Sequence, residues 1–170
     1  RNHMQYHRDP ETPDTMVRFG LYALRTHEVV LHETCAIAHP AADVTRKAVE
    51  RYFDTVPQNR ADEKKAPWTL VVRVGTQTQQ VAYAIKSAEG KQCRYDGLSE
   101  YIERSLREQN LLFEVNQTQI TEKIDGRTFR VSIDSFFQVN TAQADALYRR
   151  IKDLLPDDAA NTTLLDLYCG

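Results

Sequence analysis

The sequence predicts an α+β domain with antiparallel strands over residues 1–134, followed over residues 135–170 by the first elements of an α/β domain. Short runs in which apolar and polar residues alternate indicate strands, and two amphipathic stretches among them indicate helices. Asp125-Gly126, between two such runs, is a strong signal for a two-residue hairpin turn. The closing run 164–170 is apolar, carries an acid and ends in glycine, as does the first strand of an α/β nucleotide-binding sheet.

Strands are expected first at residues 2–7, 16–24 and 28–33, with a loop rich in proline and acids between the first two. The runs 68–74 and 81–85 alternate so that their large apolar residues share one face, which predicts an antiparallel hairpin with one covered face. Further strands are expected at 111–115, 119–124 and 127–133.

Helices are expected where apolar residues recur every three or four positions. This spacing occurs over residues 43–53, after Pro40, and again over 98–109. A third helix is expected to carry Ala144, Leu147, Ile151 and Leu154. Asn140, three residues before Gln143, is expected to cap that helix, and Thr141 is the alternative cap if the helix starts one residue later.

The composition limits the class of protein. At 41% hydrophobic residues and with no apolar run near the roughly 18 residues of a membrane span, the chain is expected to be soluble and to bind no membrane. A net charge of −2 argues against strong non-specific binding of polyanions, although a local basic patch stays open. Three dispersed cysteines are typical of a reducing compartment, so we expect a cytoplasmic protein. The five histidines lack the spacing of a metal site and are interpreted as half-exposed strand residues.

Two motifs at a fixed separation indicate a family. S-F-F-Q-V-N-T-A-Q at residues 135–143, a helix of about four turns, and L-L-D-L-Y-C-G at 164–170 together resemble the RNA (uracil-5-)-methyltransferases. The stretches R-N-H-M, F-G-L-Y, E-V-V-L-H-E-T-C-A-I-A-H-P and R-V-S-I-D-S agree with this resemblance in family order, and the middle of the chain matches in outline. The resemblance implies an RNA-facing central domain over 1–134 and the start of a class I, Rossmann-like domain that binds S-adenosylmethionine over 135–170.

The resemblance also implies a reaction. Such enzymes transfer a methyl group from S-adenosylmethionine to C5 of a uridine in 23S ribosomal RNA or tRNA, through a cysteine adduct at C6 of the base. The nucleophilic cysteine and a glutamate base lie later in the family than residue 170, so the chain is expected to be a monomeric, inactive fragment of an enzyme. The target base must leave its stack to reach the site.

The resemblance assigns roles to several residues near the end of the chain. Phe136 is expected to stack on the flipped uracil, and Gln138 to bind S-adenosylmethionine or orient the base. The alternative is that Phe136 and Phe137 anchor the core and Gln138 is a polar residue at the start of the helix. Asp166, Tyr168 and Gly170 are expected to bind the cofactor, with an ordinary buried strand end as the alternative.

The two cysteines at positions 35 and 169 have separate interpretations. Cys169 is assigned to packing because no histidine or base neighbours it in the sequence. Cys35, in the spacing C-x-x-x-x-P, is either a buried structural residue or the fourth ligand of a four-iron four-sulfur cluster that some family members carry. The other three ligands of that cluster would precede this chain, and the similarity favours ribosomal RNA over tRNA as substrate.

Contacts with RNA from the first domain are less specific. Tyr6, Arg8, Arg18 and Arg25 are candidates for stacking or backbone contacts, with ordinary surface or core roles as the alternative. Two rival functions stay open: an RNA-binding module without catalysis, and a class I methyltransferase of small molecules or proteins. The second gives no reason for the S-F-F-Q-V-N run.

Overall fold

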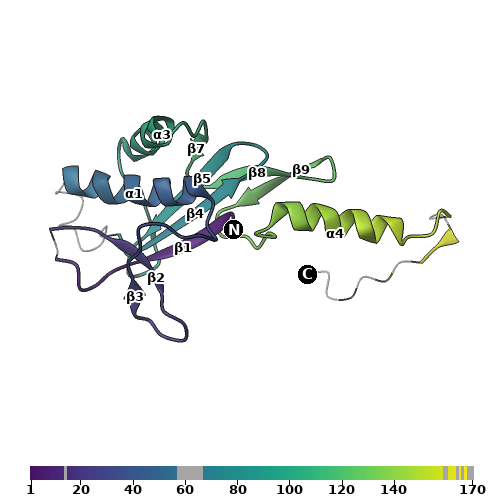
Figure 1. Ribbon diagram of the computed structural model, residues 1–170, viewed down its shortest axis with the longest axis horizontal. Helices are drawn as coiled ribbons and strands as arrows, with labels where there is room; N and C mark the ends of the chain where they lie inside the picture. The colour runs from purple at the N-terminus through teal and green to yellow at the C-terminus, as the bar shows by residue number, and fades with distance from the viewer. Residues whose placement is uncertain (14, 57–66, 159–160, 164, 166, 168–170) are drawn as a thin grey trace.

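A mixed β-sheet forms the centre of the molecule (Figure 1). The computed structural model describes residues 1–13, 15–56, 67–158, 161–163, 165 and 167. Within them, a seven-stranded sheet has the order β3-β2-β1-β4-β5-β6, and β7 pairs with β5 in parallel while the other pairs are antiparallel. The strands of this sheet are β1 (His3–Arg8), β2 (Phe19–Tyr22), β3 (Val29–Val30), β4 (Thr69–Gly75), β5 (Gln80–Lys86), β6 (Gln92–Cys93) and β7 (Glu114–Asn116).

Helices α1 (Pro40–Thr55) and α3 (Leu98–Glu108) cover one face of the sheet (Figure 1). Both were expected from their apolar spacing, and the structure confirms them. Val49 and Phe53 of α1 and Ile102 of α3 are fully buried in a core that also contains the alternate residues of β4 and β5, such as Leu70 and Tyr83. Burial of this continuous apolar face is the main stabilising contribution to the fold.

The hairpin of β8 (Gln119–Ile124) and β9 (Arg127–Ser132) covers part of the opposite face. Val71, Ala82 and Ala84, which interrupt the alternation of β4 and β5, pack there against Ile120 and Val131. The expectation that this hairpin of β4 and β5 has only one covered face is therefore wrong. Alanines leave room for a second layer to approach closely, and this explains the blurred alternation.

The turn between β8 and β9 confirms its sequence signal. Asp125 and Gly126 have φ values of 49° and 73°, the left-handed backbone that a two-residue hairpin turn of type I′ requires at both positions.

Three predicted strands are clearly shorter than expected. The strand expected at 16–24 is reduced to β2 (Phe19–Tyr22), and the other two have a physical reason. In the stretch 28–33 only Val29 and Val30 pair with β2, because the carbonyls of His32 and Glu33 accept hydrogen bonds from the Arg46 side chain. The strand expected at 111–115 begins only at Glu114. The turn that ends α3 occupies Asn110 and Leu111, whose amides bond back to Arg107 and Leu106.

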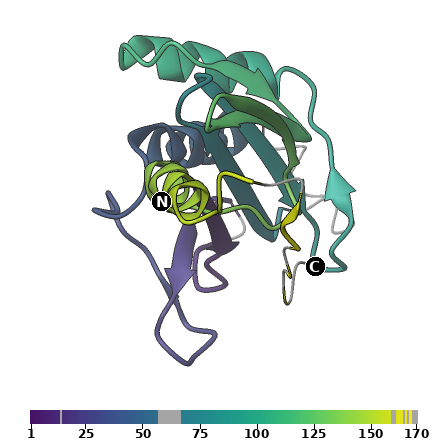
Figure 2. The same ribbon diagram turned by 90° about the vertical axis from the view of Figure 1, so that its right-hand side faces the viewer.

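Helix α4 (Thr141–Asp153) extends away from the sheet in Figure 1 and is seen nearly end-on in Figure 2. Only Thr141 and Ala144 of this helix are buried, while Leu147 and Ile151 stay exposed. No helix among the described residues is both long and apolar enough to span a membrane. Sheet and helices occur as expected, whereas the division into domains at residues 134 and 135 stays a prediction.

Candidate functional site

The segment that links β9 to α4, residues 133–140, carries the Phe136 and Gln138 predicted to bind the substrate. Its first residue, Ile133, is buried, and its amide donates to the carbonyl of Thr118 at 2.8 Å. The amide and hydroxyl of Ser135 both donate to the carbonyl of Ser132, at 3.3 and 3.0 Å, which closes a turn. The segment therefore leaves the hairpin in a defined direction.

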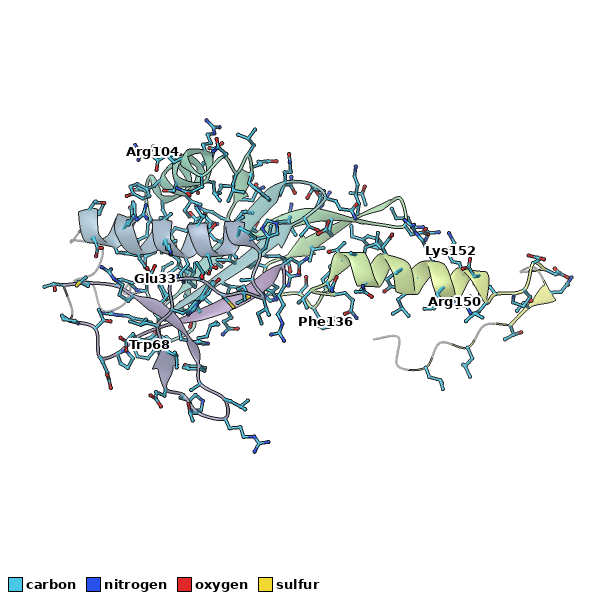
Figure 3. All side chains as sticks on the ribbon, viewed as in Figure 1. Glu33, Trp68, Arg104, Phe136, Arg150 and Lys152 are labelled. Atoms are coloured by element: carbon cyan, nitrogen blue, oxygen red, sulfur yellow. The ribbon has the colours of Figure 1, made fainter. Side chains whose placement is uncertain are left out.

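The two adjacent phenylalanines of this segment have different environments. Phe137 is half-buried, packs against the second core cluster and lies 5.9 Å from the ring of Phe129. Phe136 is 87% exposed and lies where the sheet meets α4 (Figure 3). The core-anchor alternative therefore fits Phe137 and does not fit Phe136.

The amide side chain of Gln138 is also exposed, two residues after Phe136. Gln138 does not start the helix, because Asn140 fills that role: its side-chain oxygen accepts from the amide of Gln143 at 3.2 Å. The predicted cap is confirmed. An accessible aromatic ring and an accessible amide thus lie close together on one segment, as a site for a planar base with hydrogen-bonding edges requires.

Three charged or titratable side chains lie under the start of this segment. Arg73 of β4 donates to the carbonyl of Ser135 at 2.5 Å and to Nδ1 of His3 at 3.3 Å. Lys86 of β5 forms an ion pair with Asp134 at 2.7 Å. Burial and the charge of Arg73 lower the pKa of His3 to about 4, so its imidazole is neutral at pH 7.

The far end of the segment is held by a second polar network. The amide of Asn2 donates to the carbonyl of Val139 at 3.2 Å, and the Asn2 side chain donates to Oγ1 of Thr141 at 3.1 Å. Thr141 in turn donates to the carboxylate of Glu122, which is fully buried in the hairpin and also accepts from the amide of Thr76, each at 3.1 Å. Phe136 and Gln138 are therefore exposed between two fixed points.

The other predicted cofactor residues cannot be placed beside this segment. Asp166, Tyr168 and Gly170 lie outside the described residues, as does Cys169. Their assignments remain predictions. For S-adenosylmethionine, the described residues offer the exposed amide of Gln138, which suits a polar group of such a ligand.

Cys35 is a half-buried free thiol beside a cavity of about 480 Å³, on the side of α1. Its amide donates to Asp43 at 3.0 Å, and its carbonyl accepts from Ala38, so the backbone here is well fixed. No group of three or more His, Cys, Asp or Glu side chains that could hold a metal occurs in the described part of the chain. These residues supply one thiol for a cluster that needs four ligands.

Of the four residues predicted to contact RNA, Tyr6 is the clearest correction. Its ring is fully buried against α1, because β1 turns even-numbered side chains toward the helices. Arg18 is paired with Asp54 at 3.1 Å, and Arg8 is half-buried. Arg25 is exposed in the turn after β2, at a φ of 62°.

Sequence reasoning missed Arg73, His3 and Glu122, which fix the ends of the segment. A signal was present for two of them. Arg73 interrupts an otherwise apolar strand, and Glu122 falls on the buried face of β8 between Ile120 and Ile124. A charged residue at a core position marks a specific partner.

Comparisons with known proteins agree with the motifs. No model of a protein family matches the chain. An uncharacterized RNA methyltransferase of Enterococcus faecalis is 28% identical over 179 residues, which cover 92% of this chain and 39% of that protein. The tRNA (uracil-5-)-methyltransferase homolog B of Danio rerio is 48% identical over 54 residues, or 32% of this chain and 11% of its own length. The chain thus spans about two fifths, or less, of these relatives.

The fold has a solved counterpart as well. The crystal structure of Pyrococcus abyssi tRNA (uracil-54, C5)-methyltransferase in complex with S-adenosyl-L-homocysteine superimposes with a TM-score of 0.59 at 17% identity, over 92% of this chain and 41% of that one. At that identity the likeness shows a shared fold. Together with the named relatives it confirms the resemblance found in the motifs: the chain is similar to proteins named RNA methyltransferases and to a tRNA (uracil-5-)-methyltransferase homolog.

Proposed function

We propose that the whole protein transfers a methyl group from S-adenosylmethionine to C5 of a uridine in RNA. The observation that carries this proposal is the exposed ring of Phe136 beside the exposed amide of Gln138, on a segment fixed at both ends. Phe136 is 87% exposed, so the face of its ring is free to stack on an unstacked base. Relatives named RNA methyltransferases support a nucleobase as that partner.

The chain's own residues would bind and orient the base. Phe136 stacks on the uracil after it leaves its helix, and Gln138 donates or accepts at the edge of the base or at the cofactor. S-adenosylmethionine supplies the methyl group. The cysteine thiolate that the family resemblance implies adds to C6, so C5 becomes nucleophilic and takes the methyl group. A base then removes the C5 proton and the thiolate leaves.

The RNA substrate, the cellular location and the oligomeric state are further proposals. We place the protein in the cytoplasm as a monomer acting on 23S ribosomal RNA or tRNA. The similarity around Cys35 favours ribosomal RNA, whereas the structural neighbour is named a tRNA methyltransferase. If Cys35 completes an iron–sulfur cluster, aerobically purified full-length protein will contain iron, and Cys35→Ser will lower its iron content.

The test is methyl transfer by the full-length protein. With S-adenosylmethionine labelled in its methyl group and separate tRNA and ribosomal RNA substrates, the label is expected in 5-methyluridine on nucleoside analysis. RNA that carries 5-fluorouridine at the target should form a lasting covalent complex, because fluorine cannot be removed as a proton. Label in protein or in another nucleoside would contradict the proposal, and RNA binding without transfer would favour the binding-module alternative.

A further inference from the structure

Arg73 is the largest fully buried side chain among the described residues, and its charge has no obvious reason to be inside β4. It is 2% exposed and lies opposite His3 of β1 in the sheet register. Burying a guanidinium is strongly unfavourable unless its donors are used. Burial lowers the pKa of Arg73, yet a guanidinium keeps its proton in a folded protein. The hydrogen bonds of its terminal nitrogen therefore offset only part of the cost of its burial, because the buried Nε has no partner among the described residues.

One terminal nitrogen of Arg73 reaches the segment that carries Phe136, whereas the buried Nε has no hydrogen-bond partner among the described residues. That terminal nitrogen donates to the carbonyl of Ser135 at 2.5 Å, a short charge-assisted hydrogen bond. The same nitrogen faces Nδ1 of His3 at 3.3 Å, and neutral His3 accepts there. The carboxylate of Asp134, which Lys86 holds at 2.7 Å, adds a nearby negative charge that favours the charged guanidinium.

Ser135 immediately precedes Phe136, so a fixed Ser135 carbonyl fixes the peptide plane from which the exposed ring projects. Phe137 is held in the second core cluster, and the Val139 carbonyl is held by Asn2. Phe136 has no comparable burial of its own. Its orientation therefore depends on the residues on either side of it, and Arg73 makes the strongest contact before it.

We propose that Arg73 is a positioning residue, which holds the carbonyl of Ser135 and so presents the Phe136 ring in the orientation that accepts the target base. Its effect on methylation rests on the proposed function. Its effect on the structure of the segment 133–140 is independent of the proposed function. In a purely structural role, Arg73 would stabilise the sheet without any specific link to Phe136.

The link is tested by a double-mutant cycle in the full-length protein. Arg73→Met is expected to lower the single-turnover rate of methyl transfer at saturating RNA about tenfold to hundredfold, with a far smaller change in RNA affinity. Arg73→Lys, which keeps one donor, should restore part of the rate. In a Phe136→Ala background, Arg73→Met should slow the reaction no further, because the ring that it positions is gone.

Arg46 of α1 supplies the matched control. It is also a buried arginine that donates to carbonyls, those of Phe19 and His32, but it lies on the helix-covered side of the sheet. Arg46→Met is expected to change the rate of methyl transfer by the same factor in the wild-type and in the Phe136→Ala background. If the rate losses caused by Arg73→Met and by Phe136→Ala also multiply in the double variant, the positioning role is wrong.

Amide hydrogen exchange on this chain separates the inference from the proposed function. The amides of Ser135 and Ile133 are hydrogen-bonded beside the contact of Arg73 with Ser135. In Arg73→Lys and Arg73→Met we expect these amides to exchange about tenfold faster or more, with amides paired between β4 and β5 changed far less. Unchanged exchange at Ser135 overturns the inference whatever the methylation result. Suppose that exchange is faster but Phe136→Ala has no effect on methylation. Arg73 then still holds the Ser135 carbonyl, and the proposed role of Phe136 is wrong.

Discussion

At the scale of single residues, the structure separates neighbours that look equivalent in the sequence. Phe136 and Phe137 are both apolar, yet after the turn at Ser135 one ring is exposed and the other packs onto the β8–β9 layer. Buried polar residues determine this direction. Arg73 and Glu122 each satisfy donors or acceptors at one end of the segment, so the two charges hold its path more strictly than apolar contacts could.

Glu122 should therefore contribute strongly to stability. Glu122→Gln leaves the space filled but places an NH₂ group among the amides and hydroxyl that donate to the carboxylate. We expect the free energy of unfolding to fall by about 1–3 kcal/mol, measured by urea denaturation. The control Glu103→Gln, in an exposed pair with Arg107, should change it by less than about 0.5 kcal/mol. Equal effects of the two variants would show that the buried network is unimportant.

His3 predicts how stability depends on pH. Its folded pKa of about 4 lies below the ordinary value of 6.5, so the unfolded chain binds more protons than the folded one between these limits. Stability from this residue is fully present above pH 6.5 and is lost as the pH falls toward 4. The urea midpoint of the wild-type chain should thus drop between pH 7 and 5, and drop less in His3→Gln. A His3→Gln variant whose midpoint falls with pH as steeply as that of the wild type would refute the assignment.

At the scale of elements, the β8–β9 hairpin serves as a second layer and also sets the position of the functional segment. Its inner face covers Val71 and the alanines of β5, its tip contacts α4 through the amide of Asp125 and the side chain of Asp145 at 2.6 Å, and its last strand leads to Phe136. The geometry of its turn therefore affects the whole site.

Replacing Gly126 tests that turn. At a φ of 73° a side chain is strained although open space surrounds its position, so Gly126→Ala should destabilise the chain by about 1–2 kcal/mol in urea denaturation. Gly126→Asn tolerates the left-handed backbone better and should lose less. An alanine variant as stable as the wild type would mean that another turn geometry is accessible.

Helix α4 differs from α1 and α3 because its apolar face is not covered in the described chain. Leu147 is 55% exposed and Ile102 of α3 is fully buried. In this chain, Ile102→Ala should lower the free energy of unfolding by about 2–5 kcal/mol, and Leu147→Ala by less than about 0.5 kcal/mol. The two midpoints in urea check this. A large loss with Leu147→Ala would show that α4 packs on the sheet.

At the scale of the whole molecule, a sheet is covered on one side by helices and partly on the other by a hairpin, and the segment after the hairpin leads to α4 (Figure 1). That segment carries the exposed Phe136. Local patterns were enough to predict α1, α3, the β4–β5 pair and the Asp125-Gly126 turn, because each depends on periodicity or backbone chemistry within a short stretch.

What the sequence could not predict depends on contacts between distant residues. Arg46 shortened a strand by taking the carbonyls of His32 and Glu33, and Tyr6 proved to be buried once β1 was paired with β4. The hydrogen bond from Arg73 to the carbonyl of Ser135 joins residues 62 positions apart. Periodicity carries no information on such pairs. The motifs predicted Phe136 and Gln138 through resemblance, and the structure added that both are accessible.

The most direct measurement is the single-turnover rate of methyl transfer to RNA uridine by full-length Phe136→Ala, compared with wild type and with Leu112→Ala. Leu112 is an exposed apolar residue after α3 and is not part of the segment 133–140. Loss of one base–aromatic stack should slow Phe136→Ala about tenfold to hundredfold and leave Leu112→Ala unchanged. Equal rates in all three proteins would contradict a base-stacking role for Phe136 and, with it, the proposed site.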